Sequence, residues 1–194
     1  MNSQPAINLY HGDYRKTLSH VQADLIFTSP PYNIGSKCRR IDGCRKSGQY
    51  DPKSYGAITD YADSLPEDVY QRHQTAFFLW CADHMKQDGV LVYNHKPRRR
   101  DGQMLHPAQW FLLPKVAQKL CLMEEIIWDR GSTHNHANRL MWPTTERLYV
   151  FRKPNGNYRL KNHHGLPHRA DLWKIQRAPN NGHNAPFPVA LATA

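Results

Sequence analysis

The sequence has 194 residues, of which 40% are hydrophobic, and its 26 lysines and arginines against 16 aspartates and glutamates give a formal net charge of +10. This length allows one domain with a sizeable core, and the lack of any run of about 18 apolar residues excludes a membrane-spanning helix. The excess of positive charge favours a polyanionic partner, because phosphates neutralised by a protein release their counterions.

The cysteines and histidines argue against a disulfide framework and against a metal site. The four cysteines lack paired spacing, which favours reduced thiols in a cytoplasm. The opening residues, "MNSQPAINLYHGD", contain no signal-peptide hydrophobic region, so we expect a cytoplasmic protein. The twelve histidines, including those of "HNH" (134–136) and "NHHG" (162–165), are interpreted as part of a basic, polar surface, and no metal is expected.

The first third of the chain predicts a strand, a helix and a second strand with short connections. We expect the strand at Ile7–Tyr10, the helix at Tyr14–Val21 and the second strand at Asp24–Phe27. This series is typical of a βαβ unit. The segment Gly35–Tyr61 is rich in glycine and charge, and we expect a long mobile loop there.

The middle of the chain predicts a long helix, a buried strand and a basic loop. The helix begins near Pro66, which suits a first helical turn, and its apolar stripe continues to about Lys86. A turn at Asp88–Gly89 precedes the strand Val90–Tyr93. The basic segment "HKPRRRDGQ" (His95–Gln103) follows, and we expect a second mobile loop.

The second half of the chain continues the alternation of helices and strands. We expect a helix at Pro107–Leu120 and strands at Glu124–Trp128 and Glu146–Phe151, followed by a polar region that ends at "DLWKI" (Asp171–Ile175). The alternation predicts an α/β fold in one domain, 1–194, with ligands at the carboxyl ends of the strands. The segment "TSPPYNIG" (Thr28–Gly35) lies at such an end.

The tetrapeptide Ser29-Pro30-Pro31-Tyr32 suits the binding of a planar base that carries an amino group. The two prolines remove N–H donors and stiffen the loop, so that it presents carbonyl oxygens. The Ser29 hydroxyl can accept a hydrogen bond, and Tyr32 offers a face for stacking. Acceptors for both amino hydrogens would localise the nitrogen lone pair for attack, on a base flipped out of a duplex. The alternative is a proline-rich turn that ends a strand.

Beyond the tetrapeptide, an ordered set of segments resembles a known enzyme family. These are "LYHGDY", "ADLIFTSPPYNIG", "DGVLVYN", "TTERLYVFRK", "DLWKI" and "GHNAPFP". Together they resemble the DNA amino-methyltransferases, which methylate N4 of cytosine or N6 of adenine, and more narrowly their permuted β group. The resemblance runs from about Ile7 to Leu191. It implies a Rossmann-like methyltransferase fold with a mostly parallel sheet, S-adenosyl-L-methionine as cofactor and double-stranded DNA as partner.

The resemblance also implies roles for individual residues. Ser29, Pro30, Pro31 and Tyr32 match the catalytic motif, in which Ser29 and the Pro30 carbonyl would hold the amino group and Tyr32 would stack on the base. Asp13 matches the position that contacts the cofactor adenine, although a turn aspartate is an equal reading. The residues that match the motif beside the cofactor methionine are His183, Ala185, Pro186, Phe187 and Pro188. Phe187 could equally be a core aromatic, and Asn184 stands where the family more often has proline.

One motif of this family is missing from the sequence. The β group has a Phe-x-Gly-x-Gly turn beyond the "APFP" segment, and no such turn occurs in this chain. We therefore expect a fold that is incomplete at its C-terminal side, in which the strand Ile7–Tyr10 lacks its usual partner. Either a second chain supplies the missing cofactor-binding half, or the product no longer methylates.

Basic residues are expected to contact DNA phosphates around the site. The candidates are Lys96, Arg98, Arg99, Arg100, Arg130 and Arg139. Each could instead be a solvated surface charge. The two expected loops, 35–61 and 95–103, would order over DNA, and 153–180 is a candidate short target-recognition insert.

Three functions remain open from the sequence. The leading one is a DNA amino-methyltransferase, with N4-cytosine favoured over N6-adenine because Ser29 replaces the aspartate common in the adenine enzymes. The second is a non-catalytic nucleic-acid-binding remnant of such an enzyme. A metal-dependent nuclease has little support, since no carboxylate and histidine cluster shows metal-ligand spacing.

Overall fold

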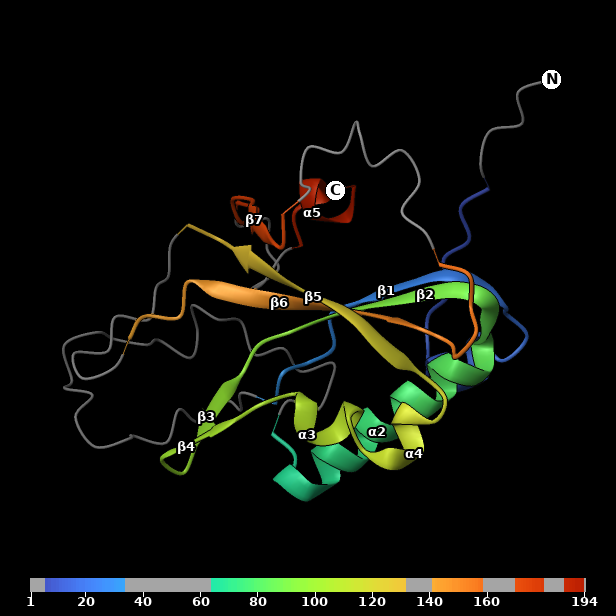
Figure 1. The fold of residues 1–194 in the computed structure, drawn as a ribbon, viewed down its shortest axis with the longest axis horizontal. Helices are drawn as coiled ribbons and strands as arrows, with labels where there is room; N and C mark the ends of the chain where they lie inside the picture. Colours follow the sequence, from blue (N-terminus) through green and yellow to red (C-terminus); the bar gives the residue numbers. More distant parts are fainter. Residues whose placement is uncertain (1–5, 34–63, 132–140, 159–169, 180–186, 194) are drawn as a thin grey trace.

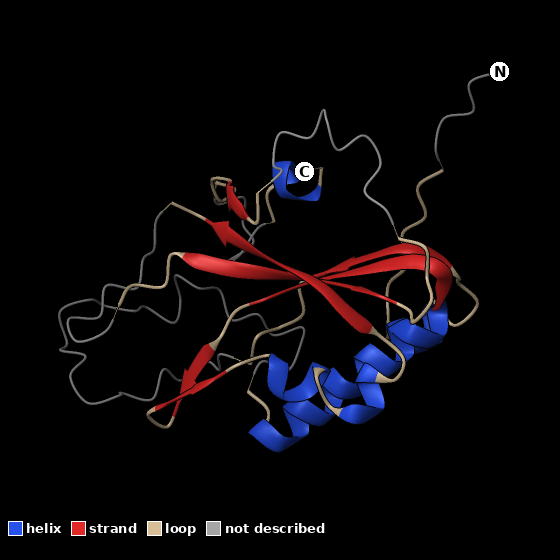
Figure 2. Ribbon diagram, viewed as in Figure 1, coloured by secondary structure: helices blue, strands red, loops and turns tan. Residues whose placement is uncertain are grey.

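The computed structural model describes residues 6–33, 64–131, 141–158, 170–179 and 187–193. Within them, a twisted five-stranded sheet lies against a layer of helices (Figures 1 and 2). In the sheet order β1-β2-β6-β5-β7, the strands are β1 (Ala23–Thr28), β2 (Met85–His95), β6 (Thr145–Arg152), β5 (Cys121–Asp129) and β7 (Leu172–Lys174). The predicted α/β class is confirmed.

Strand direction places five chain segments at one edge of the sheet. β1 pairs with β2 and β5 pairs with β7 in parallel, whereas β6 is antiparallel to both β2 and β5. Only β6 therefore runs against the other strands of this sheet, which is consequently mostly parallel. The carboxyl ends of β1, β2, β5 and β7 meet the amino end of β6, and the predicted base-binding segment follows β1 there.

The larger core lies between the sheet and the helices α2 (Glu67–His84), α3 (Ala108–Phe111) and α4 (Pro114–Ala117). Phe78 of α2 is fully buried against Tyr93 and Phe151, with ring centroids 4.8 and 5.1 Å away. Burying such rings contributes about 1.5–3 kcal/mol each. On β2, Leu91 joins this core while its neighbours Val90 and Val92 pack on the opposite face, as the period of two in a strand requires.

The opposite face of the sheet carries a smaller core. Ile126, Trp128, Leu148 and Val150 are buried there, and the short helix α5 (Val189–Ala192) adds Leu191, which is 2% exposed. Figure 1 shows α5 on the side of the sheet away from α2. Both faces of the central strands are thus covered, which fixes the ends of these strands for the site.

Three expected elements are formed differently. The helix predicted at 107–120 is divided into α3 and α4, because Leu113 precedes Pro114 and takes the extended conformation, with ψ 140°. The expected turn at Asp88–Gly89 is an irregularity inside β2, which extends back to Met85. The basic segment at 95–103 is not a loop: it holds the end of β2 and a hairpin of β3 (Arg98–Arg100) and β4 (Gln103–Leu105).

The strand predicted at Ile7–Tyr10 is absent, and this prediction was wrong. These residues have no regular structure, and Ile7 and Leu9 are 84% and 93% exposed. A strand needs a neighbour for its backbone hydrogen bonds, and no described segment pairs with residues 7–10. The following helix, α1 (Tyr14–Thr17), is also shorter than expected.

β1 forms an edge of the sheet in the described part of the chain. It pairs only with β2 there, and its Leu25 side chain is 59% exposed. The expected loop at 35–61 lies outside the described residues. Among the described helices, none is both long and apolar enough to cross a membrane.

Candidate active site

Asn94 joins the two hydroxyl groups of the predicted catalytic tetrapeptide. It lies near the end of β2, is 1% exposed, and its Oδ1 accepts hydrogen bonds from Ser29 Oγ at 3.1 Å and from Tyr32 Oη at 2.7 Å. Its Nδ2 donates to the Arg147 carbonyl at 3.1 Å. Because the amide nitrogen is occupied by β6, the amide oxygen faces the tetrapeptide. Ser29 itself is exposed, so its hydroxyl can also meet a ligand.

A buried carboxylate completes this hydroxyl cluster. Glu146, at the start of β6, is 7% exposed and accepts the Tyr32 Oη proton at 2.9 Å. Its other oxygen accepts from Arg130 Nη1 at 2.9 Å, and Lys96 Nζ lies 3.9 Å away. Burial and then the Glu146 charge raise the pKa of Tyr32. The phenol therefore stays protonated and acts as a donor.

The Tyr32 ring is half-buried rather than open to a cleft as the sequence led us to expect. Its centroid lies 4.4 Å from that of the His95 ring, tilted by 38°, and Lys96 Nζ lies 5.7 Å from the Tyr32 centroid. His95 is fully buried, and burial lowers its pKa to about 3. A neutral imidazole thus packs against the ring that is predicted to stack on a base.

A second set of contacts fixes the backbone of the tetrapeptide. The Pro31 carbonyl accepts from the Tyr70 hydroxyl at 2.8 Å, and the same hydroxyl lies 2.8 Å from His95 Nε2. His95 Nδ1 lies 2.7 Å from the Lys96 carbonyl, so Nδ1 must carry the ring proton. No donor among the described residues bonds the Pro30 carbonyl, the group predicted to hold the amino nitrogen.

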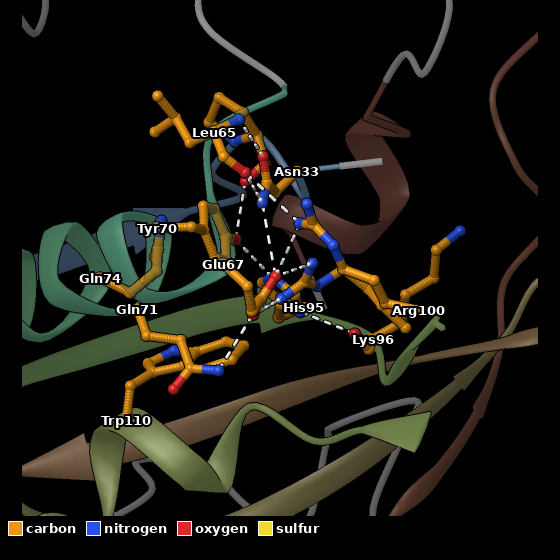
Figure 3. A network of polar contacts seen from close by, with 12 residues as sticks. Asn33, Leu65, Glu67, Tyr70, Gln71, Gln74, His95, Lys96, Arg100 and Trp110 are labelled. Carbon is orange, nitrogen blue, oxygen red and sulfur yellow. Dashed lines mark hydrogen bonds and ion pairs between the residues drawn. The ribbon is translucent and has the colours of Figure 1, made fainter. Parts of the chain in front are cut away.

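Asn33 and Glu67 connect the end of the tetrapeptide to the start of α2 (Figure 3). The Asn33 side chain donates to the Leu65 carbonyl at 3.0 Å and accepts from the Leu65 N–H at 2.7 Å. Glu67 accepts from Arg98 at 2.7 and 3.1 Å and from Arg100 at 3.1 Å. Burial would raise the pKa of Glu67, but the hydrogen bonds led by Arg98 outweigh it and lower the pKa. The β3–β4 hairpin is thereby attached beside the tetrapeptide.

The structure separates the basic residues that were predicted to bind DNA. Arg98 is 7% exposed and pairs with Glu67, so its predicted phosphate contact is wrong. Arg100, Arg130 and Lys96 are half-buried and lie beside carboxylates. Arg99 is exposed and remains a candidate for a phosphate contact. Arg139 lies outside the described residues.

The predicted cofactor residues are only partly described. Both Asp13 oxygens accept from the Arg15 side chain, at 2.6–3.1 Å, and Asp13 caps α1. These hydrogen bonds from Arg15 lower the pKa of Asp13 to about 2. The Phe187 ring packs on Phe27 of β1, with centroids 5.0 Å apart, and Pro188 precedes α5. His183, Ala185 and Pro186 lie outside the described residues.

A family model brings these features together. The N6/N4 methyltransferase model, described as "DNA methylase", matches residues 23–194. This range includes the tetrapeptide, Asn94 and Glu146. The chain belongs to the DNA methylase family. No curated protein matches the chain significantly.

Solved structures of DNA methyltransferases share the fold of this DNA methylase. "PvuII DNA methyltransferase (cytosine-N4-specific)" has a TM-score of 0.65 at 16% identity, over 94% of this chain and 66% of that one. TTHA0409 of Thermus thermophilus, a "Putative DNA Modification Methylase", has a TM-score of 0.53 at 19% identity, over 93% and 69%. Its complex with S-adenosyl-L-methionine has a TM-score of 0.52 at 20% identity. The Rossmann-like methyltransferase fold is confirmed, and the chain spans about two thirds of the length of these structures.

Several residues of the DNA methylase site were not singled out from the sequence. Asn94 and His95 follow a buried strand, and polar residues at that place are the signal that could have found them. Glu146 looked like an ordinary polar residue at the start of a strand, and Glu67 like a first-turn acid of a helix. Among the described residues, no group of three or more histidine, cysteine or acidic side chains could hold a metal ion.

Proposed function

We propose that this protein is an S-adenosyl-L-methionine-dependent DNA methyltransferase that acts on an exocyclic amino group of a flipped base. The observation that carries the proposal is the hydroxyl cluster at the end of β1. There, Asn94 and Glu146 hold the Ser29 and Tyr32 hydroxyls beside two prolines. The proline-rich turn of the alternative reading would not require these buried partners.

The cluster orients Ser29 to accept from the substrate. The Ser29 proton is directed to Asn94 Oδ1, which leaves the oxygen lone pairs for an amino N–H. The Pro30 carbonyl would accept the second N–H. Two acceptors favour a pyramidal amino nitrogen, and this interaction strengthens toward the transition state, where it lowers the barrier.

The cofactor would supply an electrophilic methyl group to the amino nitrogen. Phe187 suits packing against an apolar part of the cofactor, because its ring is half-buried on β1. Asp13 suits a hydrogen-bonded amino group, although Arg15 now uses both of its oxygens. The described chain thus offers two walls of a cofactor site, and we expect weak cofactor binding by residues 1–194 alone.

The edge of β1 suggests how that site becomes complete. Leu25, Ile7 and Leu9 are all more than half exposed, and β1 has unpaired backbone groups on this side in the described chain. We propose that a further β-segment, supplied by a second chain, pairs with β1 and provides the remaining cofactor contacts.

N4 of cytosine is the proposed target in preference to N6 of adenine. Ser29 offers a neutral hydroxyl where the adenine enzymes commonly have a carboxylate. Methyl transfer to DNA of mixed sequence, followed by digestion to nucleosides, distinguishes the two products by chromatography. N4-methylcytosine is expected once the complementary segment is supplied, and none from Ser29→Ala.

The second candidate is a non-catalytic nucleic-acid-binding protein that keeps the basic surface. The occupation of Asp13 by Arg15 favours it. Calorimetric titration with S-adenosyl-L-methionine separates the candidates. Binding that strengthens when the complementary segment is present supports the enzyme, and the absence of binding in both cases supports the binding protein. Robust methylation by residues 1–194 alone would contradict the proposed second chain.

A further inference from the structure

Two large apolar side chains are exposed where the chain enters β6. Met141 is 90% exposed and Trp142 is 55% exposed. Scattered apolar residues are common on protein surfaces, so exposure alone assigns no role to this pair. Its location does, because the segment leads directly into Glu146 of the hydroxyl cluster.

Arg130 holds this segment against the site. Its backbone N–H donates to the Thr144 carbonyl at 3.0 Å, and its Nη2 donates to the Pro143 carbonyl at 2.8 Å. The same guanidinium donates to Glu146 at 2.9 Å, and Glu146 accepts from Tyr32. Trp142 therefore immediately precedes a carbonyl that is two side chains away from the ring predicted to stack on the base.

The backbone around Trp142 is constrained, and its surroundings are cationic. Pro143 restricts the preceding residue to an extended conformation, which reduces the entropy lost when Trp142 binds. Lys96 and Arg130 lie at the same edge of the sheet, and the whole chain carries a net charge of +10. An exposed aromatic ring beside cations suits a stacked polyanion better than an apolar protein surface.

We propose that Trp142, with Met141 beside it, inserts into the base stack of duplex DNA next to the base that is extruded. This inference rests on the proposed function. Extrusion requires unstacking and unpairing, and proteins that open or kink a duplex commonly insert apolar side chains between base steps. The indole ring would replace the stacking that the neighbouring base loses, and so hold the duplex open while the target occupies the tetrapeptide.

The test uses binding and fluorescence, and needs neither cofactor nor turnover. Duplexes of one sequence, either fully paired or with a single C·C mismatch, carry 2-aminopurine beside the central position. Wild-type protein should bind the mismatched duplex more tightly, because its stack is already weakened, and should raise the 2-aminopurine signal. Trp142→Ala should bind that duplex roughly 5- to 100-fold more weakly, as expected for the loss of one stacked ring, and lose most of the signal.

Two variants control for the chemistry and the place of the substitution. Trp142→Phe keeps a ring and should retain most of the discrimination. Leu122→Ala removes an apolar side chain that is 38% exposed at the opposite end of the sheet, and should behave as wild type. Since Trp142 is exposed, its truncation should barely change the thermal midpoint.

The outcomes separate this inference from the function on which it rests. If wild type does not discriminate mismatched from paired DNA, base extrusion is absent and both fail. If wild type discriminates and Trp142→Ala does so equally well, only the inference is overturned. Unchanged DNA binding with altered sedimentation of free Trp142→Ala would instead identify a protein interface and overturn it too.

Discussion

At the scale of single residues, the Tyr32 hydroxyl has more partners than a stacking ring requires. It lies within hydrogen-bonding distance of Ser29, Asn94 and Glu146. The ring and the hydroxyl therefore have separable tasks: the ring faces the base, and the hydroxyl fixes the ring and satisfies a buried carboxylate. The sequence indicated the first task only, because nothing in the spacing of Tyr32 and Glu146 predicts their contact.

Two substitutions of Tyr32 separate these tasks. Tyr32→Phe should lower the free energy of unfolding by about 1–3 kcal/mol, because buried acceptors lose a donor, while binding to mismatched DNA stays near the wild-type value. Tyr32→Ala should in addition weaken that binding by about 1–3 kcal/mol. Urea unfolding and fluorescence anisotropy measure the two effects. Equal DNA affinities for the two variants would argue against base stacking by the ring.

His95 predicts a dependence of stability on pH. Its folded pKa is about 3, below the unfolded value of 6.5, so the unfolded chain binds more protons between these values. Its contribution to stability is therefore fully present above pH 6.5 and decreases as the pH falls toward 3, by up to about 1.4 kcal/mol per pH unit. Urea unfolding between pH 4 and pH 7 measures this slope. His95→Asn should flatten it, and an unchanged slope would assign the effect to other groups.

At the scale of elements, the hairpin β3–β4 shows what local sequence could and could not predict. The dipeptide Asp101-Gly102 has positive φ values of 49° and 77°, the requirement of a two-residue hairpin turn, so the basic segment does contain a local hairpin signal. The burial of Arg98 had no such signal, because it depends on Glu67, which is 31 positions earlier in the chain. The strands of the central sheet were predictable from apolar runs, whereas their partners were not.

Arg98 and Arg99 are neighbours with opposite expected effects. Arg98→Ala leaves Glu67 without its main partner and should destabilise the fold by about 3–5 kcal/mol. Arg99→Ala should leave stability unchanged, weaken binding to all DNA sequences and reduce the salt slope by about one. Thermal unfolding and binding at several salt concentrations test this pair. A stable Arg98→Ala variant that has lost DNA affinity would restore the original phosphate-contact prediction.

At the scale of the whole molecule, the two sides of the sheet are unequal. β6 lies between β2 and β5, whereas β1 has a described partner on one side only. Backbone amides on the outer side of β1 and in residues 6–12 should exchange with solvent much faster than those of β6. Hydrogen exchange measured on the isolated chain tests this. Slow exchange along both sides of β1 would show that a partner, such as a second copy, already covers the edge.

The hydrogen bond between Tyr32 and Glu146 joins positions 114 residues apart. Contacts of such sequence separation close long loops and form late, after local helices and hairpins. β6 must also take one register, because a shift by one residue would turn Glu146 to the other face of the sheet. The base-binding cluster should therefore be among the last features to form during refolding. A chain cleaved between these two residues would have to reassociate before it could hold a base.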